Sequence, residues 1–268
     1  MGHVRLGKIP TTKKWQSVVS LVANPSSESN KSEKLSDNVH ELARETLNAA
    51  QKGLERAKQD FGLRYSFYLL TQIVLATRAS DWQTSLEKIG IYLSEDATIF
   101  DLTTKIQTVI DDVLFEQSCS TDISEIAQQA IGEAFSSLAS NQQIPLFGNT
   151  RDELISVINQ LSTKKGFSQL GQVFFGRFMA RFLNFYLSRI TAANLNTEQL
   201  TNIGELTKFN EALQRHCEQS AKIVYDFCGQ WYSKTEFQEG INLDNSSNFM
   251  AVALKKLQAE LKQQEAEL

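Results

Sequence analysis

The sequence of 268 residues has little cysteine, proline or glycine, and each shortage excludes a class of protein. Three cysteines do not make a disulfide framework in a chain of this length. Three prolines and 13 glycines argue against collagen, low-complexity disorder and a turn-rich β-sandwich. A chain this long buries about 70–75% of the surface that its unfolded form exposes, so it needs no disulfide or metal for stability.

Long apolar runs are also missing. The most apolar stretch, 65–79, is about 15 residues long and contains several polar side chains, whereas a membrane span needs about 20 apolar residues. We therefore expect a core helix there and no stable membrane span. Residues 1–10 are basic but lack the apolar segment of a secretory signal. The expected location is the cytoplasm, which also suits unpaired thiols.

Charge is nearly balanced over the whole chain but unevenly distributed. With 27 basic and 31 acidic residues, the formal net charge is −4, which does not indicate general attraction to nucleic acid or anionic lipid. Residues 1–23 nevertheless carry a net charge of +4 with no acidic residue. By contrast, residues 91–135 hold nine acidic residues against the single Lys105, which is typical of a solvated acidic face.

Apolar residues recur every three or four positions in most of the chain, the spacing of one face of an α-helix. No alternating apolar and polar run is bounded by hairpin turns. The pattern predicts an all-α, multi-helix bundle of roughly eight to ten helices with a short tethered N-terminal arm. The clearest periodic segments are 13–23, 39–61, 99–114, 123–138, 209–231 and 250–261.

Helix boundaries are indicated by capping residues. In a capping box, the side chain of the residue just before a helix accepts a backbone N–H of the first turn. The side chain three positions later bonds back to the backbone N–H of that first residue. Glycine often ends a helix, and Gly90 and Gly166 are the expected stops. The expected capping pairs are Ser80 with Gln83, Asp122 with Glu125, Thr150 with Glu153, and Ser233 with Glu236.

Composition divides the chain into three parts. Residues 1–23 form a basic N-terminal arm with a short amphipathic helix, and residues 24–36 read as a polar, serine-rich linker. Residues 37–268 form the helical body. A loop at 141–149, with one proline and one glycine, is the expected boundary between two lobes of that body.

The N-terminal arm gives the sharper functional hypothesis. A tethered basic segment can dock onto a second protein and fold on contact, and tryptophan and arginine are favoured binding anchors. The alternative, left open by the sequence, is that the apolar stripe of the arm packs onto this protein's own body. The partner-binding residues expected in the arm are Gly2, Arg5, Lys8, Lys13, Lys14 and Trp15.

Residues 154–197 contain no aspartate or glutamate but many phenylalanines. Basic residues among aromatics can bind a nucleic-acid backbone and stack bases, which makes this segment a candidate for anion or nucleic-acid contact. A helix that is apolar around most of its circumference is instead buried in a bundle, and we favour that interpretation. Arg189 projects into the apolar arc and needs an acidic partner, for which 91–135 is the expected source. The candidate contact residues are Lys164, Lys165, Arg177 and Arg181, and the two arginines share a narrow polar strip with Asn184 and Ser188.

Few residues suggest catalysis. The three histidines form no metal-binding motif, so no metal or cofactor is expected. Cys217 and Cys228 lie on one apolar stripe and are expected to be buried. Cys119 precedes a helix start, where a thiol pKa is lowered, which makes it the one candidate nucleophile.

These observations favour a non-catalytic scaffold or adaptor subunit that binds other proteins within a larger assembly. An enzyme is the less favoured interpretation. The alternatives are a nucleic-acid-binding helical module that uses residues 154–197 and a membrane-active effector that releases its phenylalanine-rich helix.

Overall fold

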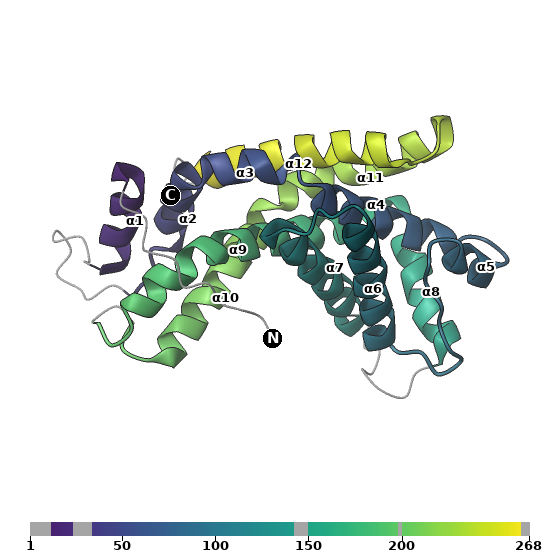
Figure 1. The fold of residues 1–268 in the computed structure, drawn as a ribbon, viewed down its shortest axis with the longest axis horizontal. Coiled ribbons are helices and arrows are strands. Elements are labelled where there is room, and N and C mark those ends of the chain that lie inside the picture. The colour runs from purple at the N-terminus through teal and green to yellow at the C-terminus, as the bar shows by residue number, and fades with distance from the viewer. Residues whose placement is uncertain (1–11, 24–33, 142–149, 198–199, 264–268) are drawn as a thin grey trace.

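The computed structural model describes residues 12–23, 34–141, 150–197 and 200–263, and these residues form twelve helices and no strand. The predicted all-α class is therefore confirmed (Figure 1). In none of the described helices is there an apolar stretch long enough to cross a membrane. The helices are α1 (Lys13–Ala23), α2 (Val39–Ala49), α3 (Gln51–Ala57), α4 (Phe61–Ala76), α5 (Trp82–Glu87), α6 (Ile99–Glu116), α7 (Asp122–Asn141), α8 (Arg151–Leu161), α9 (Lys164–Ala193), α10 (Ile203–Ser220), α11 (Lys222–Gln238) and α12 (Leu243–Gln263).

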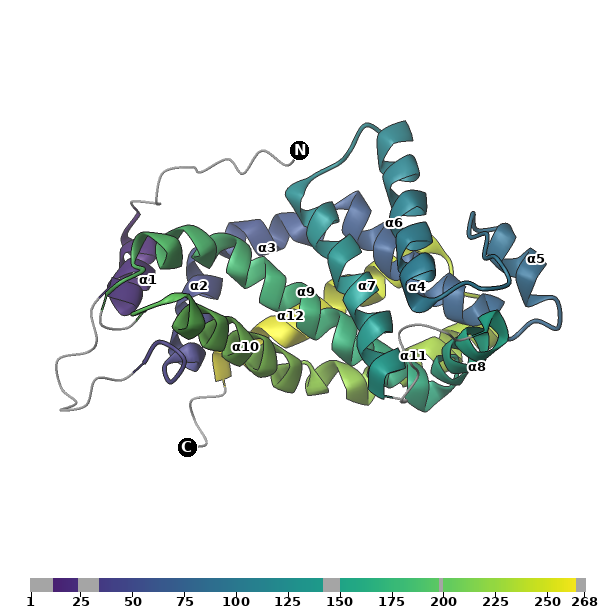
Figure 2. The same ribbon diagram turned by 90° about the horizontal axis from the view of Figure 1, so that it is seen from below.

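The molecule is elongated, with α1 at one end and α5 at the other (Figures 1 and 2). In Figure 1, α11 and α12 run along one long side, whereas α6, α7 and α8 project from the opposite side. Helix α9 runs through the middle and packs against α7, α10 and α11.

Helix α9 is the predicted core helix of the acid-free segment. Thr163 caps it by accepting the backbone N–H of Gly166. Sixteen of its 30 residues are buried, including five of its six phenylalanines, so it is apolar around most of its circumference. Burial of that surface is the main force that holds the bundle together.

Aromatic rings join four helices into one core. Phe67 of α4 lies 5.2 Å, centroid to centroid, from Phe175 of α9 and 5.6 Å from Phe249 of α12. Trp231 of α11 stacks on Phe249 at 4.2 Å. Offset and edge contacts between rings add to the energy of burial, so this cluster fixes how α4, α9, α11 and α12 pack.

Two predicted helices are each divided. The segment 39–61 breaks at Ala50 and again before Asp60, whose side chain accepts the N–H of Leu63 and begins α4. The segment 209–231 breaks at Ala221, between α10 and α11. Periodicity continues across these breaks because the flanking helices bury the same side of the chain.

Of the four predicted capping pairs, one is confirmed. Thr150 and Glu153 bond reciprocally at the start of α8. The other three predictions are wrong: Asp81, not Ser80, caps α5, and Ser233 lies inside α11. At the start of α7, Thr121 pairs with Ser124, one position before the predicted pair.

The two glycines expected to end helices have different roles. Gly90 has a φ of +83° just after α5, which is the left-handed conformation expected of a helix stop. The expectation for Gly166 is wrong, because it lies in the first turn of α9. A Cβ there would lie 2.2 Å from the carbonyl oxygen of Gln160, so glycine allows α8 and α9 to approach closely.

The N-terminal helix α1 docks on the body of its own chain. Trp15, Val18 and Val22 are buried, and α1 packs mainly against α2. The end of the predicted linker also belongs to the body, because Leu35 is buried and the amine of Lys34 lies 3.0 Å from the Glu205 carboxylate. The rest of the linker, 24–33, and most of the predicted lobe boundary, 142–149, lie outside the described residues.

Candidate functional site

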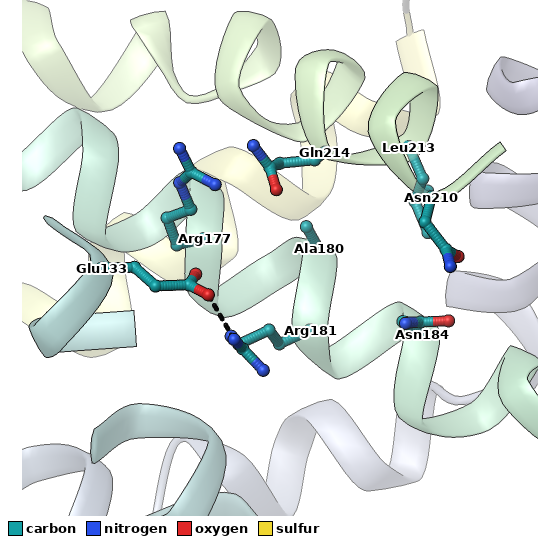
Figure 3. Close-up of a pocket in the computed structure, with 8 residues that line it drawn as sticks. All are labelled: Glu133, Arg177, Ala180, Arg181, Asn184, Asn210, Leu213 and Gln214. Atoms are coloured by element: carbon teal, nitrogen blue, oxygen red, sulfur yellow. Dashed lines mark hydrogen bonds and ion pairs between the residues drawn. The ribbon is translucent and has the colours of Figure 1, made fainter. Parts of the chain in front are cut away.

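The predicted polar strip of α9 faces a trench between α7 and α10 (Figure 3). The trench consists of two adjoining pockets of about 160 and 240 Å³ that share Arg181 and Asn184. Asparagine and glutamine side chains from α7, α9 and α10 complete its walls. We define the α9 trench by its polar lining residues: Asp122, Glu125, Gln129, Glu133, Arg177, Arg181, Asn184, Ser188, Asn210 and Gln214.

Both arginines of the trench are ion-paired. Arg177 Nε lies 2.8 Å from the Glu218 carboxylate of α10. The guanidinium of Arg181 donates to Glu133 and Gln129 of α7 (Figure 3 shows the Glu133 pair). The trench is therefore a polar seam in which the charges of three helices neutralise one another.

The candidate nucleic-acid residues are not brought together. Lys164 and Lys165 are exposed at the first turn of α9, whereas Arg177 is about 18 Å further along the helix axis at roughly 1.5 Å per residue. Arg189 is half-buried rather than fully buried. Arg181 of α9 forms an ion pair with Glu133, which belongs to the acidic region 91–135.

The expected burial of Cys217 and Cys228 is confirmed. Cys217 and Cys228 are fully buried free thiols, and burial raises the pKa of both. Cys119 is partly exposed and also a free thiol. Among the described residues, no group of three or more histidine, cysteine, aspartate or glutamate side chains is placed to hold a metal ion.

A contact between two histidines was not predicted from the sequence. The rings of His40 on α2 and His216 on α10 meet edge to face with centroids 4.2 Å apart. His216 is 2% exposed, and neither of its ring nitrogens has a hydrogen-bond partner among the described residues. Burial, together with the neighbouring His40, lowers the pKa of His216 to about 4.

A larger cavity, of about 1100 Å³, lies where α1 meets the junction of α2 and α3. Its floor is Tyr186 of α9, and its walls are the first turn of α1 and the exposed side of α3. We call it the α1 groove and define it by its lining residues: Thr12, Lys13, Lys14, Trp15, Asn48, Ala49, Ala50, Gln51, Lys52, Gly53, Glu55, Arg56 and Tyr186.

Aromatic packing forms the floor of the α1 groove. Trp15 stacks on Tyr186 with ring centroids 5.4 Å apart. The Tyr186 hydroxyl lies against Gly53, where a Cβ would come within 2.1 Å of the oxygen, so a side chain at Gly53 would displace the tyrosine. Burial raises the pKa of Tyr186, which keeps the phenol protonated and able to donate a hydrogen bond at neutral pH.

The walls of the α1 groove carry cations without partners. Within the described ranges, the exposed side chains of Lys13, Lys52 and Arg56 form no ion pair or hydrogen bond. Lys14 is engaged weakly, with its amine 3.5 Å from the Asn48 carbonyl at the end of α2. The four cations and Glu55 together give the lining a net charge of +3.

The one acid of the groove does not neutralise these cations. The carboxylate of Glu55 lies 2.6 Å from the amine of Lys58, one helical turn further along. The first turn of α1 has no acidic residue and instead carries Lys13 and Lys14. A cation at the positive end of a helix dipole is unfavourable by about 0.3–1 kcal/mol, and a bound anion would relieve that repulsion.

No protein-family model, curated protein or solved structure matches this chain. The geometry and charge of its own surfaces are therefore the guide to its function.

The α1 groove includes three of the residues predicted to bind a partner. Lys13 and Lys14 line its rim, but Trp15 is only 8% exposed and packs onto its own chain. The other three predicted residues, Gly2, Arg5 and Lys8, lie outside the described residues. Sequence reasoning missed three lining residues on other helices, Lys52, Arg56 and Tyr186. The four-residue spacing of Lys52 and Arg56, which places both on one helix face, was the available signal.

Proposed function

We propose that this protein is a non-catalytic helical scaffold or adaptor subunit that binds another protein through the α1 groove. The observation that carries the proposal is a set of cations, Lys13, Lys52 and Arg56, that have no partner among the described residues and surround a cavity of about 1100 Å³. Charges left unpaired on one face give association speed and specificity more than they stabilise the fold.

The non-catalytic part of the proposal is supported by the state of the ionisable groups elsewhere. Arg177 and Arg181 are held in ion pairs, and the thiols of Cys217 and Cys228 are buried in the core. Catalytic groups are usually found with perturbed pKa values in an accessible cleft, whereas these groups are engaged or enclosed. Three free thiols also suit the proposed location in the cytoplasm.

The two alternatives have less support. A nucleic-acid module built on residues 154–197 would need Arg177 and Arg181 to leave their ion pairs with Glu218 and Glu133. A membrane-active effector would need α9 to leave the centre of the bundle, where sixteen of its residues are buried. Both steps would expose apolar surface or buried charge.

The test is co-purification of the tagged full chain from its source cells, followed by mass spectrometry. Deleting residues 1–23 would uncover the side of α2 that Trp15, Val18 and Val22 cover, so charge reversal is the cleaner change. We expect a defined protein partner to be lost from the double variant Lys52→Glu with Arg56→Glu.

The matched control is Lys164→Glu with Lys165→Glu, which reverses two exposed charges at the far end of α9. This control should keep the partner that the groove variant loses. If the wild-type chain co-purifies with no protein in stoichiometric amount, the adaptor proposal is wrong.

A further inference from the structure

We infer that the α1 groove binds a segment of a partner protein that is rich in aspartate or glutamate. This inference rests on the proposed function and adds the chemistry of the partner. It follows from the charge, the aromatic floor and the size of the groove.

Charge complementarity requires an anionic ligand. Lys13 approaches the groove from α1, and Lys52 and Arg56 approach it from α3, so cations line two separate walls. Lys52 and Arg56 are four residues apart on one helix and therefore lie on the same face, about 6 Å apart at their Cβ atoms. An acidic segment in the groove would pair with both walls at once.

The floor supplies a hydrogen-bond donor. The hydroxyl of Tyr186 has no hydrogen-bond partner among the described residues, and it lies at the surface of the groove beside Gly53. A protonated phenol donates to a carboxylate oxygen. Tyr186 would therefore position one acidic side chain of the ligand between the two basic walls.

The aromatic floor favours a peptide over a nucleic acid. Binding of single strands uses exposed aromatic faces on which bases stack. In the α1 groove, Trp15 and Tyr186 stack on each other, and Trp15 is only 8% exposed.

The size of the groove favours a chain segment over a small anion. Pockets for small molecules are typically about 300–1000 Å³ and enclose most of the ligand. The α1 groove is larger, and its cations are exposed, so a single phosphate would stay largely hydrated. A peptide with several carboxylates would gain affinity from the sum of many weak contacts.

Segments of the chain itself are possible competitors. Residues 1–11 carry Arg5 and Lys8 and no acid, so their charge does not suit the groove. Residues 264–268 contain Glu265 and Glu267, and a chain ending at residue 263 controls for them. A second copy could offer the acidic, exposed end of α6, where Phe115 is 85% exposed.

The experiment is a titration of the full chain with a fluorescein-labelled peptide of alternating glutamate and serine, followed by fluorescence anisotropy. The controls are the same peptide with glutamine in place of glutamate, and labelled oligothymidylate. We expect binding of the glutamate peptide that weakens as salt rises, little binding of the glutamine peptide, and weaker binding of the oligonucleotide.

Two pairs of variants locate the site. The change of Lys52→Glu with Arg56→Glu should weaken peptide binding by about tenfold or more, because two attractions become repulsions. The change of Lys164→Glu with Lys165→Glu should leave the affinity within about twofold, because exposed charges at that distance are screened. Circular dichroism of each variant checks that the fold is intact.

Each contrary result has a definite meaning. Equal peptide binding by both variants, or tighter binding of oligothymidylate than of the peptide, overturns the inference. Binding that appears only in the chain ending at residue 263 assigns the groove to the C-terminal segment and overturns it as well. A dimer in sedimentation that Lys52→Glu with Arg56→Glu dissolves would assign the groove to a second copy.

These outcomes are separate from the test of the proposed function. If a protein co-purifies but is retained by the groove variant, the adaptor proposal stands and the groove inference fails. If the acidic peptide binds the groove but no protein co-purifies, the preference of the groove for carboxylates stands and the adaptor proposal fails.

Discussion

The α9 trench and the α1 groove are both polar cavities lined with basic residues, but they differ in whether those residues form ion pairs within the described structure. In the trench, Arg177 pairs with Glu218 and Arg181 pairs with Glu133, so the charges hold three helices of the same chain together. In the groove, Lys13, Lys52 and Arg56 face the cavity without partners among the described residues. The same residue types thus form ion pairs within the fold in the trench, whereas in the groove the described residues leave them available for the partner that we propose.

The difference shows why basic residues in a sequence do not by themselves locate a binding site. The acid-free segment 154–197 has the more unusual composition, yet its arginines find acids on neighbouring helices. The cations of the groove come from two helices, and of these only α1 lies in a segment with an excess of basic charge. What distinguishes the sites is the partner of each charge, and that depends on tertiary packing.

The largest expected effect is a loss of stability in acid, and it arises at the end of the molecule that carries the α1 groove. Because the folded pKa of His216 is about 4 and its ordinary value is 6.5, the unfolded chain takes up the proton first as the pH falls. The free energy of unfolding should therefore fall between about pH 6.5 and pH 4, by up to about 3 kcal/mol. Urea unfolding at a series of pH values measures this loss.

The variant His216→Leu isolates that contribution from the other titrating groups. It replaces two ring nitrogens that have no hydrogen-bond partner in the described part of the chain with an apolar side chain, so we expect equal or greater stability at pH 7 and a weaker loss in acid. Hydrogen exchange in wild type should increase in α2 and α10 before α7 and α9. A wild-type pH profile that matches the variant would contradict this account of His216.

The next largest effect is the stability lost when the ion pair between Arg181 and Glu133 in the α9 trench is removed. Replacing Arg181 with Leu leaves the partly buried Glu133 without its main partner, and we expect a loss of about 1–2 kcal/mol. Replacing Glu133 with Leu should cost a similar amount, and the double variant should be more stable than the two single losses added together predict. Thermal and urea unfolding of the four proteins give this double-mutant cycle; strict additivity would show that the pair is not coupled.

A smaller effect is expected for Tyr186→Phe, which removes the hydroxyl and keeps the ring stacked on Trp15. We expect stability to change by less than about 0.5 kcal/mol and acidic-peptide affinity to fall about threefold to tenfold, the range of one typical hydrogen bond in water. Unfolding and anisotropy measured on the same preparation separate the two quantities. Unchanged affinity would remove Tyr186 from the binding surface.

The smallest effect on stability is expected in the groove walls. Lys52→Gln with Arg56→Gln removes two charges that have no partner within the described structure, so the free energy of unfolding should change by less than about 0.5 kcal/mol. A slight gain is equally consistent, because repulsion among the cations is relieved. A loss as large as that of Arg181→Leu would mean that these charges stabilise the fold, and the contrast with the trench would disappear.

Much of the fold could be predicted from the sequence because it depends on local periodicity. The bounds of α1, the burial of α9 and the shared strip of Arg177 and Arg181 follow from helical spacing alone. The breaks at Ala50 and Ala221 could not be predicted, because the apolar pattern continues through both. A capping box at Thr98 and Asp101 has the sequence signature but was not among the predicted pairs.

The candidate binding site could be predicted only in part. Lys13 and Lys14 were identified by the local excess of basic charge, and they do line the groove. For Lys52 and Arg56 the four-residue spacing was the one local signal, and it does not indicate binding by itself, because their importance arises from the position of α1 across the groove from α3. The contact of His40 with His216 joins residues far apart in the chain, so no spacing rule could reveal it.

The most direct test of the central contrast is a titration with the glutamate–serine peptide followed by backbone amide chemical shifts. The account predicts that the shifts change around Lys13, Trp15 and Lys52, and that they saturate together. The amides around Arg177 and Arg181 should stay unchanged through the same titration. Shift changes centred on the α9 trench, with the α1 groove unaffected, would contradict the account.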